Sequence, residues 1–266
     1  MRRLLSLGLL LAALGLAACG TRAPSSPSAW LAASLDLVDG RDTSTRFRMW
    51  MEIQRTDEAG SITRMQLERR GDASSRSASE FHIEAETQAE LIVNGELVSS
   101  GMIRDTQIGD GSTRWLQMAR PDGQPPSVLA HALDGAAREG TDALTQTAAP
   151  IDLDPLSLLR LYAEHADWVE ELASEKRYVV LMGTLTEELR SEIQRLGSAY
   201  LPERIRLSLD RDSALPIELE IIDDGHDQAD PPTGYAGKLK IRYLAWTIDP
   251  LADTLFMTPQ SAPSDD

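Results

Sequence analysis

The feature that most constrains the fold is a two-residue alternation of apolar and polar side chains that recurs along the chain. In TRFRMWMEIQ (45–54), apolar residues at every second position, from Phe47 to Ile53, alternate with mostly polar ones. Successive side chains of a β-strand point to opposite faces, so this pattern predicts a strand with one buried and one solvated face. Such strands are typical of a large antiparallel sheet. The alternation predicts further strands over residues 61–71, 80–93, 112–119, 205–212, 215–223 and 238–248.

Other segments predict the turns and helices between these strands. Asn94-Gly95 is a strong signal for a tight hairpin. Residues 151–174 have helical spacing, with Asp154 as the cap and Pro155 at the first helical position. We therefore expect an α+β fold in which helices pack on a single large antiparallel sheet. The remaining expected elements are helices at 28–40 and 186–202, a buried strand at 178–185, and a weakly helical or loop-like segment at 125–140.

The N-terminus carries the one cysteine of the chain. Arg2 and Arg3 precede an apolar run, Leu4 to Leu14, that is short for a transmembrane span. The following Leu16-Ala17-Ala18-Cys19 resembles a bacterial lipobox, in which cleavage leaves a diacylglyceryl-modified cysteine at the new N-terminus. We expect a signal peptide over residues 1–18 and lipidation of Cys19. The alternatives are an ordinary secretory signal with an incidental cysteine and an uncleaved anchor.

The rest of the chain is expected to form one domain between two short flexible segments. Residues 19–28 comprise the lipidated cysteine and a Pro/Ser-rich tether, and residues 29–259 form the domain. Residues 260–266 form a disordered tail.

The charge balance restricts the partners of this domain. The 266 residues include 26 Lys and Arg against 42 Asp and Glu, a formal net charge of −16. Such a surface is repelled by nucleic acid and by anionic lipid headgroups, so we expect no nucleic-acid partner. Membrane attachment is expected to come from the lipid on Cys19, because two or three acyl chains hold a protein stably at a bilayer.

Motifs that carry catalysis or metal binding are largely absent from the sequence. There is no Gly-x-Ser-x-Gly, Ser-x-x-Lys or phosphate-loop pattern, and the four histidines are scattered. The acidic run Asp223–Asp230 lacks EF-hand spacing and reads as a solvated hairpin loop. We therefore expect no catalytic residue, metal or cofactor, although the many carboxylates leave a hydrolase with a paired-acid site open.

The apolar face of the predicted sheet is rich in methionine and branched aliphatic residues. One interpretation is a closed core covered by the helices. The other is a sheet curled around a cavity for an apolar ligand, a role that suits methionine because its side chain is flexible and polarizable. The candidate cavity residues are Phe47, Met49, Met51, Ile53, Met65, Leu67, Phe81, Ile83, Ile205, Leu207, Leu209, Ile217, Leu219, Ile221, Leu239, Ile241 and Tyr243.

Over residues 29–259 the order of segments resembles the LolA-like family of exported lipid-binding proteins, which includes the anchored lipoproteins LppX and LprG. The resemblance depends on a short helix before TRFRMWMEI, on GDGSTRWLQ, and on LDPLSLLRLY before the central helices. It continues through YVVLMGTL, IRLSLDRDSALPIELEIID, and KLKIRYLAWTID before FMTP. It implies a half-open β-barrel of about ten or eleven strands, with helices on the concave face and a lipid or acyl chain bound without catalysis.

The leading hypothesis is therefore a LolA-like lipoprotein that binds a lipid or acyl chain, with a role in lipid or lipoprotein transfer. It would be exported and anchored to the outer face of the cell membrane or to the outer membrane, where another envelope protein could be a further partner. An anchored chain departs from the freely diffusing carrier LolA and fits LppX and LprG better. The alternative is an anchored scaffold or signalling lipoprotein, whose core is closed and whose partner is a protein.

Overall fold

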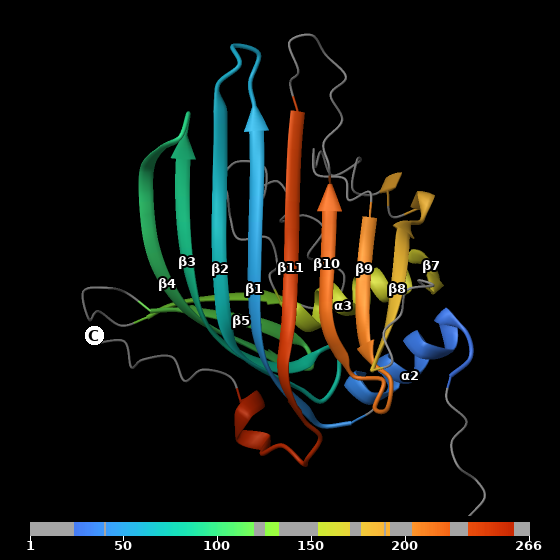
Figure 1. The fold of residues 1–266 in the computed structure, drawn as a ribbon. Coiled ribbons are helices and arrows are strands. Elements are labelled where there is room, and N and C mark those ends of the chain that lie inside the picture. The colour runs from blue at the N-terminus through green and yellow to red at the C-terminus, as the bar shows by residue number, and fades with distance from the viewer. Residues whose placement is uncertain are drawn as a thin grey trace, which may run out of the picture.

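The computed structural model describes residues 24–39, 41–119, 126–132, 154–170, 177–188, 190–191, 204–223 and 234–257. Within these ranges, eleven strands form one antiparallel sheet in the order β6-β5-β4-β3-β2-β1-β11-β10-β9-β8-β7 (Figure 1). The sheet is curved and its end strands β6 and β7 do not pair, so it is open rather than a closed barrel. The expected fold class, a large antiparallel sheet with helices, is confirmed. The strands are β1 (Thr43–Thr56), β2 (Ile62–Ser75), β3 (Glu80–Val93), β4 (Glu96–Asp110), β5 (Thr113–Met118), β6 (Ser127–Ala132), β7 (Ala166–Glu170), β8 (Tyr178–Leu185), β9 (Arg204–Asp210), β10 (Pro216–Asp223) and β11 (Gly234–Thr247).

Two meanders meet at the centre of this sheet. Strands β1 to β6 pair in chain order, and so do β7 to β11. The first strand then pairs with the last along nearly its whole length, from Ser44 opposite Thr247 to Thr56 opposite Gly234. This pairing of β1 with β11 joins residues far apart in sequence and turns two small sheets into one.

Glycines allow the sheet to turn and to curl. Asn94 and Gly95 have φ values of 52° and 85°, as a tight hairpin turn with two left-handed residues requires, so the predicted β3–β4 hairpin is confirmed. At Gly71 of β2, an added Cβ would lie 2.0 Å from the carbonyl oxygen of Glu84 on β3. Only a residue without a side chain permits strands to bend this closely together.

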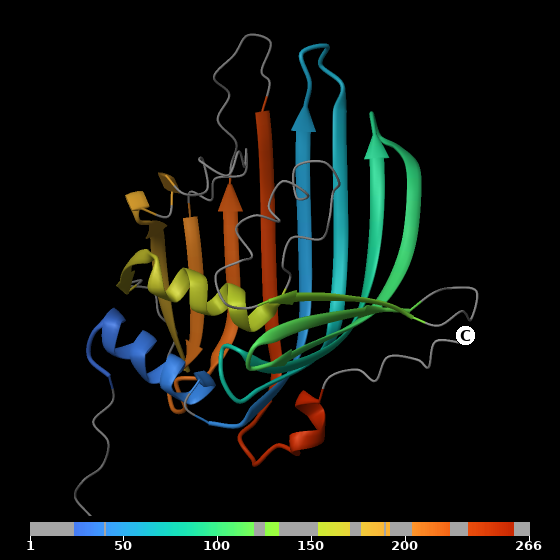
Figure 2. The same cartoon turned by 180° about the vertical axis from the view of Figure 1, so that it is seen from behind.

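Two α-helices, α2 (Pro27–Asp39) and α3 (Pro155–Glu164), pack on the concave face of the sheet. Figure 2 shows α3 crossing β8 to β11, with α2 below it, while β5 and β6 curl over the same face. Helix α3 begins as predicted, with the Asp154 carboxylate accepting a hydrogen bond from the Leu156 backbone N–H and Pro155 in the first turn. The Tyr243 hydroxyl donates a hydrogen bond of 2.8 Å to the Pro155 carbonyl, which ties the start of α3 to β11.

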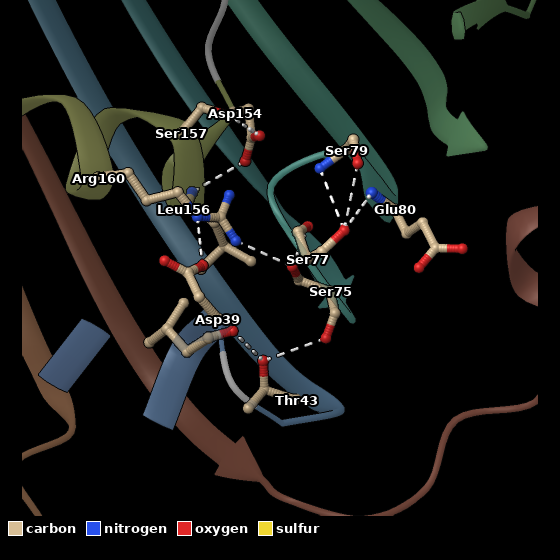
Figure 3. Close-up of polar contacts among 11 residues, drawn as sticks. Asp39, Thr43, Ser75, Ser77, Ser79, Glu80, Asp154, Leu156, Ser157 and Arg160 are labelled. Atoms are coloured by element: carbon tan, nitrogen blue, oxygen red, sulfur yellow. Dashed lines mark hydrogen bonds and ion pairs between the residues drawn. The ribbon is translucent and has the colours of Figure 1, made fainter. Parts of the chain in front are cut away.

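A buried arginine locks both helices to the sheet (Figure 3). The Arg160 guanidinium on α3 lies 2.6 Å from the carboxylate of Asp39, the last residue of α2. It also donates a hydrogen bond of 2.9 Å to the hydroxyl of Ser75, where β2 ends. The Thr43 hydroxyl at the start of β1 donates to the Val38 carbonyl. These contacts fix the helices at one end of the concave face.

A short 3-10 helix, η3 (Asp253–Phe256), packs against β3 and β4. The Arg76 guanidinium lies 4.8 Å from the centre of the buried Phe256 ring and pairs with the Asp42 carboxylate. The Leu251 backbone N–H and the Arg76 guanidinium hydrogen-bond to Asp42 and lower the pKa of its carboxyl. The C-terminal part of the domain is thereby tied to the start of β1.

Two secondary-structure predictions are wrong or only partly right. Residues 125–140 contain strand β6, which pairs with β5, rather than a weak helix or loop. The helix expected over 151–174 ends at Glu164, and strand β7 follows on the edge of β8. In both cases the free edge of a neighbouring strand supplies backbone hydrogen bonds that outweigh the local helical spacing. Most of the predicted helix 186–202 lies outside the described residues, as do the signal peptide, Cys19, most of the tether, most of the acidic run and the tail.

Candidate functional site

The concave face brings together nearly all the apolar residues singled out from the sequence. Most of them are almost fully buried, forming one core cluster with residues of α2 and α3 such as Trp30 and Leu159. The fully buried members are Phe47, Met49, Ile83, Ile205, Leu207, Leu209, Leu219, Ile221 and Ile241; Met51, Phe81, Leu239 and Tyr243 are nearly so.

Ile217 is the one candidate that does not follow the inward face of its strand. The pairing of β9 with β10 shifts between Pro216 and Glu218, so that Pro216 faces Leu209 and Ile217 becomes the extra residue of a β-bulge. Ile217 is half-buried, while Pro216 is buried in its place. The assignment of Ile217 to the inward face is therefore corrected, because simple alternation does not survive a bulge.

The apolar face continues past the helices toward the β1–β2 turn. Ile53 faces Met65 on β2, which faces Leu91 on β3. These side chains are only half-buried, although Ile53 and Met65 pack against the core cluster together with Leu67. In Figure 2 this end of β1, β2 and β3 extends beyond α3. Among the described residues, the concave face therefore has a filled half under the helices and a less buried apolar half next to it.

A buried polar cluster lies on the same face and was missed by sequence reasoning. The Arg69 guanidinium on β2 makes two parallel contacts with the Asp105 carboxylate on β4, at 2.5 and 2.7 Å. It also donates to the Thr87 hydroxyl on β3, and the Gln107 amide donates to Asp105 at 3.0 Å. The two charged side chains are 5% and 6% exposed. The cluster therefore clamps three neighbouring strands from inside the curve.

The alternation itself contained the signal for this cluster. Arg69 continues the inward positions of Met65 and Leu67, and Asp105 lies in the register that faces Ala85 on the inward side of β3. A charged residue in phase with an apolar face is expensive to bury unless it is paired. Two such residues of opposite charge on neighbouring parts of a sheet therefore predict an internal ion pair.

The opposite face of the sheet carries a hollow of about 790 Å³. Its walls come from β1 to β5, from β11 and from the residues that follow β5. They include arginines and carboxylates, among them Arg46, Arg70, Asp72, Glu84 and Arg104. Several of these form ion pairs across neighbouring strands, such as Arg46 with Asp72. The hollow is thus lined by mutually neutralising charges interspersed with apolar residues such as Leu244 and Pro126.

Ion pairs between neighbouring strands cover the same outer face. Glu218 on β10 accepts contacts of 2.7 Å from both Lys240 and Arg242 on β11. Burial raises the pKa of the Glu218 carboxyl, but hydrogen bonds from these two cations outweigh it and lower the pKa below its usual value. Arg48 and Arg242 also lie over the Trp50 ring, at 4.6 and 5.7 Å from its centre. This face is therefore a solvated exterior.

Two buried tyrosines lie between α3 and the sheet, Tyr162 on the helix and Tyr243 on β11. Burial raises the pKa of Tyr162 to about 12. Burial also raises the pKa of Tyr243, whose hydroxyl donates to Pro155. The Tyr243 hydroxyl therefore joins β11 to the start of α3.

The described residues do not assemble a metal centre: among them, no group of three or more His, Cys, Asp or Glu side chains could hold an ion. Two carboxylates in these ranges are deeply buried, and each has a structural partner. Asp105 is paired with Arg69, and Asp154 caps α3. In the same ranges, none of the helices combines the length and the apolar character needed to cross a bilayer.

Comparisons with known proteins find no family or curated relative and give weak similarity to solved structures. No protein-family model matches the chain, and no curated protein matches it. Among solved structures, a DUF1329 family protein from Desulfovibrio piger aligns over 88% of this chain and 98% of that chain, with 12% identity and a TM-score of 0.29. A β-barrel-like protein of the domain of unknown function DUF1849 from Brucella abortus aligns over 77% and 98%, with 14% identity and a TM-score of 0.19. These values are too low to transfer a function from either protein.

Proposed function

We propose that this protein is an exported, membrane-anchored lipoprotein that binds an acyl chain of a lipid on the concave face of its half-open sheet. The observation that carries the proposal is the less buried apolar half of that face, as the described residues form it. Ile53, Met65 and Leu67 point inward and pack on the core, yet each remains half-buried beyond the helices. Apolar side chains placed on a concave surface and left partly open are what an acyl chain would cover.

The energetics suit reversible loading. Burying roughly 15 methylenes of an acyl chain from water contributes about 12 kcal/mol. A chain that leaves a bilayer was already buried there, so its net transfer free energy into an apolar groove is close to zero. Such a protein would accept and release a lipid without an energy source, and it needs no catalytic residue.

The anchor in this proposal is a lipid on Cys19, with cleavage before it and residues 20–28 as the tether. It keeps an acidic domain at a surface that its own charge would repel. Mass spectrometry of the N-terminal peptide from the membrane fraction tests it: the expected result is a diacylglyceryl-modified Cys19. An unmodified N-terminus at another residue would contradict the anchor but not the acyl-chain site.

Native mass spectrometry of the full protein, extracted from bacterial membranes in mild detergent without delipidation, tests the acyl-chain site. A bound mass that matches a phospholipid or acylglycerol and disappears on organic extraction is expected. A protein that stays free of lipid after incubation with phospholipid vesicles would contradict the proposal. It would instead favour the scaffold whose core is closed, an alternative supported by the buried packing of Leu156, Leu159 and Tyr162 against the sheet.

A matched pair of variants on β2 locates the site. Leu67→Gln places a polar amide on the inward face, and burying that amide without a partner weakens binding of a fluorescent fatty-acid probe by about tenfold. Gln66 is the next residue of the strand and lies on the opposite face, where it hydrogen-bonds to Glu52. Gln66→Leu should leave the affinity unchanged. Equal effects of the two substitutions would refute the concave face as the site.

A further inference from the structure

Arg69 carries a buried hydrogen-bond donor that has no acceptor in the described part of the chain. The residue is 4% exposed, and both of its terminal nitrogens are in use. Nη1 donates to Asp105 and to Thr87, and Nη2 donates to Asp105. The Nε atom is buried as well, yet within the ranges that the structure describes it has no hydrogen-bond partner. A buried donor without an acceptor costs free energy, so this N–H requires a partner that the described residues do not supply.

The unpartnered donor lies on one side of the planar guanidinium. The contacts of Nη1 and Nη2 with the Asp105 carboxylate are end-on. They leave the side on which the Nε–H and the second N–H of Nη2 point in the same general direction. One oxygen atom can accept hydrogen bonds from both of these groups. Arg69 can therefore hold a second acceptor without releasing Asp105.

This donor lies at the border between the filled half and the less buried half of the concave face. On β1, Arg69 faces Met49, which is fully buried, and on β3 it faces Thr87. The next inward residue of β2 toward the β1–β2 turn is Leu67, which is half-buried. The side chains of Met49 and Leu67 contain no oxygen. The Nε–H of Arg69 thus adjoins the apolar surface proposed above for an acyl chain.

The row of residues that contains Arg69 continues to the margin of the sheet. Thr87 on β3 faces Ile103 on β4, and Ile103 is 47% exposed. The β-bulge of β4 lies outside this row. A ligand whose polar end leaves past Ile103 can therefore lay an apolar chain along Leu67 and bring an oxygen atom next to Arg69.

Charge decides which kind of oxygen suits this position. Asp105 already neutralises the guanidinium, and both side chains are buried. A second carboxylate, or a phosphate, beside Nε would bring two anions to one buried cation and leave a net negative charge away from water. An uncharged carbonyl oxygen accepts the same hydrogen bonds without that cost. The site therefore favours a neutral acceptor over an anionic one.

We infer that Arg69 donates a hydrogen bond to the carbonyl oxygen of an ester-linked acyl chain, so that the protein prefers ester lipids to ether lipids. The inference rests on the proposed acyl-chain site and names the part of the ligand that this site recognises. An ester carbonyl is uncharged and lies where the acyl chain joins the polar part of the lipid. An ether lipid has the same hydrocarbon chains but lacks this carbonyl.

Competition between two phosphatidylcholines tests the inference. Vesicles contain equal amounts of dihexadecanoyl phosphatidylcholine, which is an ester lipid, and of its di-O-hexadecyl analogue, which is an ether lipid with chains of the same length. The full protein is transferred from mild detergent to these vesicles. Native mass spectrometry then measures the bound ratio, because the two lipids differ in mass. One hydrogen bond from a charged donor should favour the ester lipid about tenfold.

The possible results separate this inference from the proposed function. Binding of the ester lipid about tenfold in excess of the ether lipid is expected. Equal binding of the two lipids would overturn the role of Arg69 and leave the acyl-chain site in place. Binding of neither lipid would overturn the acyl-chain site itself, and the inference with it.

Variants on β2 assign the preference to Arg69. Arg69→Met combined with Asp105→Leu removes the donor together with its counter-ion, so that no unpaired charge stays inside the fold. This double variant should bind the two lipids equally. Arg70→Met is the matched control, because Arg70 is the next residue of β2, lies on the outer face and pairs there with Glu86. It should keep the preference for the ester lipid.

A double variant that keeps the preference, with an unchanged circular dichroism spectrum, would overturn the assignment to Arg69. Loss of the preference in Arg70→Met would overturn it as well. If the double variant does not fold, the competition between the two lipids on the unmodified protein still decides whether a carbonyl is recognised.

Discussion

The buried ion pair between Arg69 and Asp105 allows a direct test of what stabilises the curved sheet. Its two charged groups face each other through two parallel contacts of 2.5 and 2.7 Å, and both side chains are about nineteen-twentieths buried. The perturbation is to remove one partner at a time, with Arg69→Met and Asp105→Leu, and then both together in the double variant. Each single change leaves one partner of the pair inside the fold without its counterpart.

The magnitude follows from this geometry. Opposite charges with centres about 4 Å apart attract by roughly 4 kcal/mol at the effective dielectric constant that suits protein sites. Breaking a buried pair by removing one partner typically costs about 3–5 kcal/mol, because the remaining charge stays desolvated. Replacing both partners with apolar side chains of similar size costs much less, since no charge is left behind. We therefore expect each single variant to lose about 3–5 kcal/mol and the double variant to recover most of that loss.

The assay is urea unfolding followed by circular dichroism, combined as a double-mutant cycle, with thermal unfolding as a check. For a domain of this size, 1 kcal/mol shifts Tm by about 2–4 °C, so each single variant should melt about 6–20 °C lower. The reasoning is refuted if the single variants lose less than about 1 kcal/mol, as an exposed pair would. It is equally refuted if the double variant loses the sum of the two single effects.

Three further predictions concern other parts of the fold. Gly71→Ala should lower the free energy of unfolding by about 3 kcal/mol or more in urea, because the added Cβ would lie 2.0 Å from the carbonyl oxygen of Glu84. Gly101→Ala is the control and should be close to neutral, because its added Cβ would have no atom within 4 Å. Similar losses for the two variants would contradict the close approach at Gly71. Arg160→Met should cost about 2–3 kcal/mol by breaking the lock between α3, α2 and β2, and unchanged unfolding would show that this lock is not needed. Burial opposes the charge of Asp110, but hydrogen bonds in the β4–β5 turn outweigh it and lower the pKa to about 2. The contribution of the Asp110 carboxylate to stability is therefore complete above about pH 3.8 and is lost as pH falls through about 2. Asp110→Asn should lower the free energy of unfolding by up to about 1 kcal/mol at pH 7 and make its dependence on pH flatter between pH 4 and pH 2. An unchanged dependence on pH would refute this.

Much of the secondary structure could be predicted from the sequence because its causes are local. The alternation in β1 and β3 reports directly which face of each strand is buried. Asn94 and Gly95 tolerate the positive φ of the hairpin, and Asp154 with Pro155 defines the start of α3. In each of these places the residue type and its immediate neighbours are sufficient to decide the conformation.

The errors occur where a distant strand supplies the deciding interaction. Residues of β7 continue a helical pattern, but the edge of β8 offers them a ladder of hydrogen bonds, and Trp168 fills the space above Gly183. Ile217 follows the alternation and is nevertheless displaced by a bulge against β9. Periodicity within one segment contains no information about the edge or register that a segment far along the chain will offer.

The residues of the candidate site show the same contrast between local and long-range causes. The sequence by itself determined that this chain has an apolar sheet face, and it identified most of the large apolar side chains that β1, β3, β9, β10 and β11 place there, because alternate residues of each strand are apolar. Only the tertiary structure decided that β1 pairs with β11 and that Arg69 meets Asp105. It also decided that, among the described residues, α2 and α3 bury one half of the face more deeply than the other. Those outcomes depend on contacts between residues tens to hundreds of positions apart, and their free energy exists only once the chain has closed those long loops.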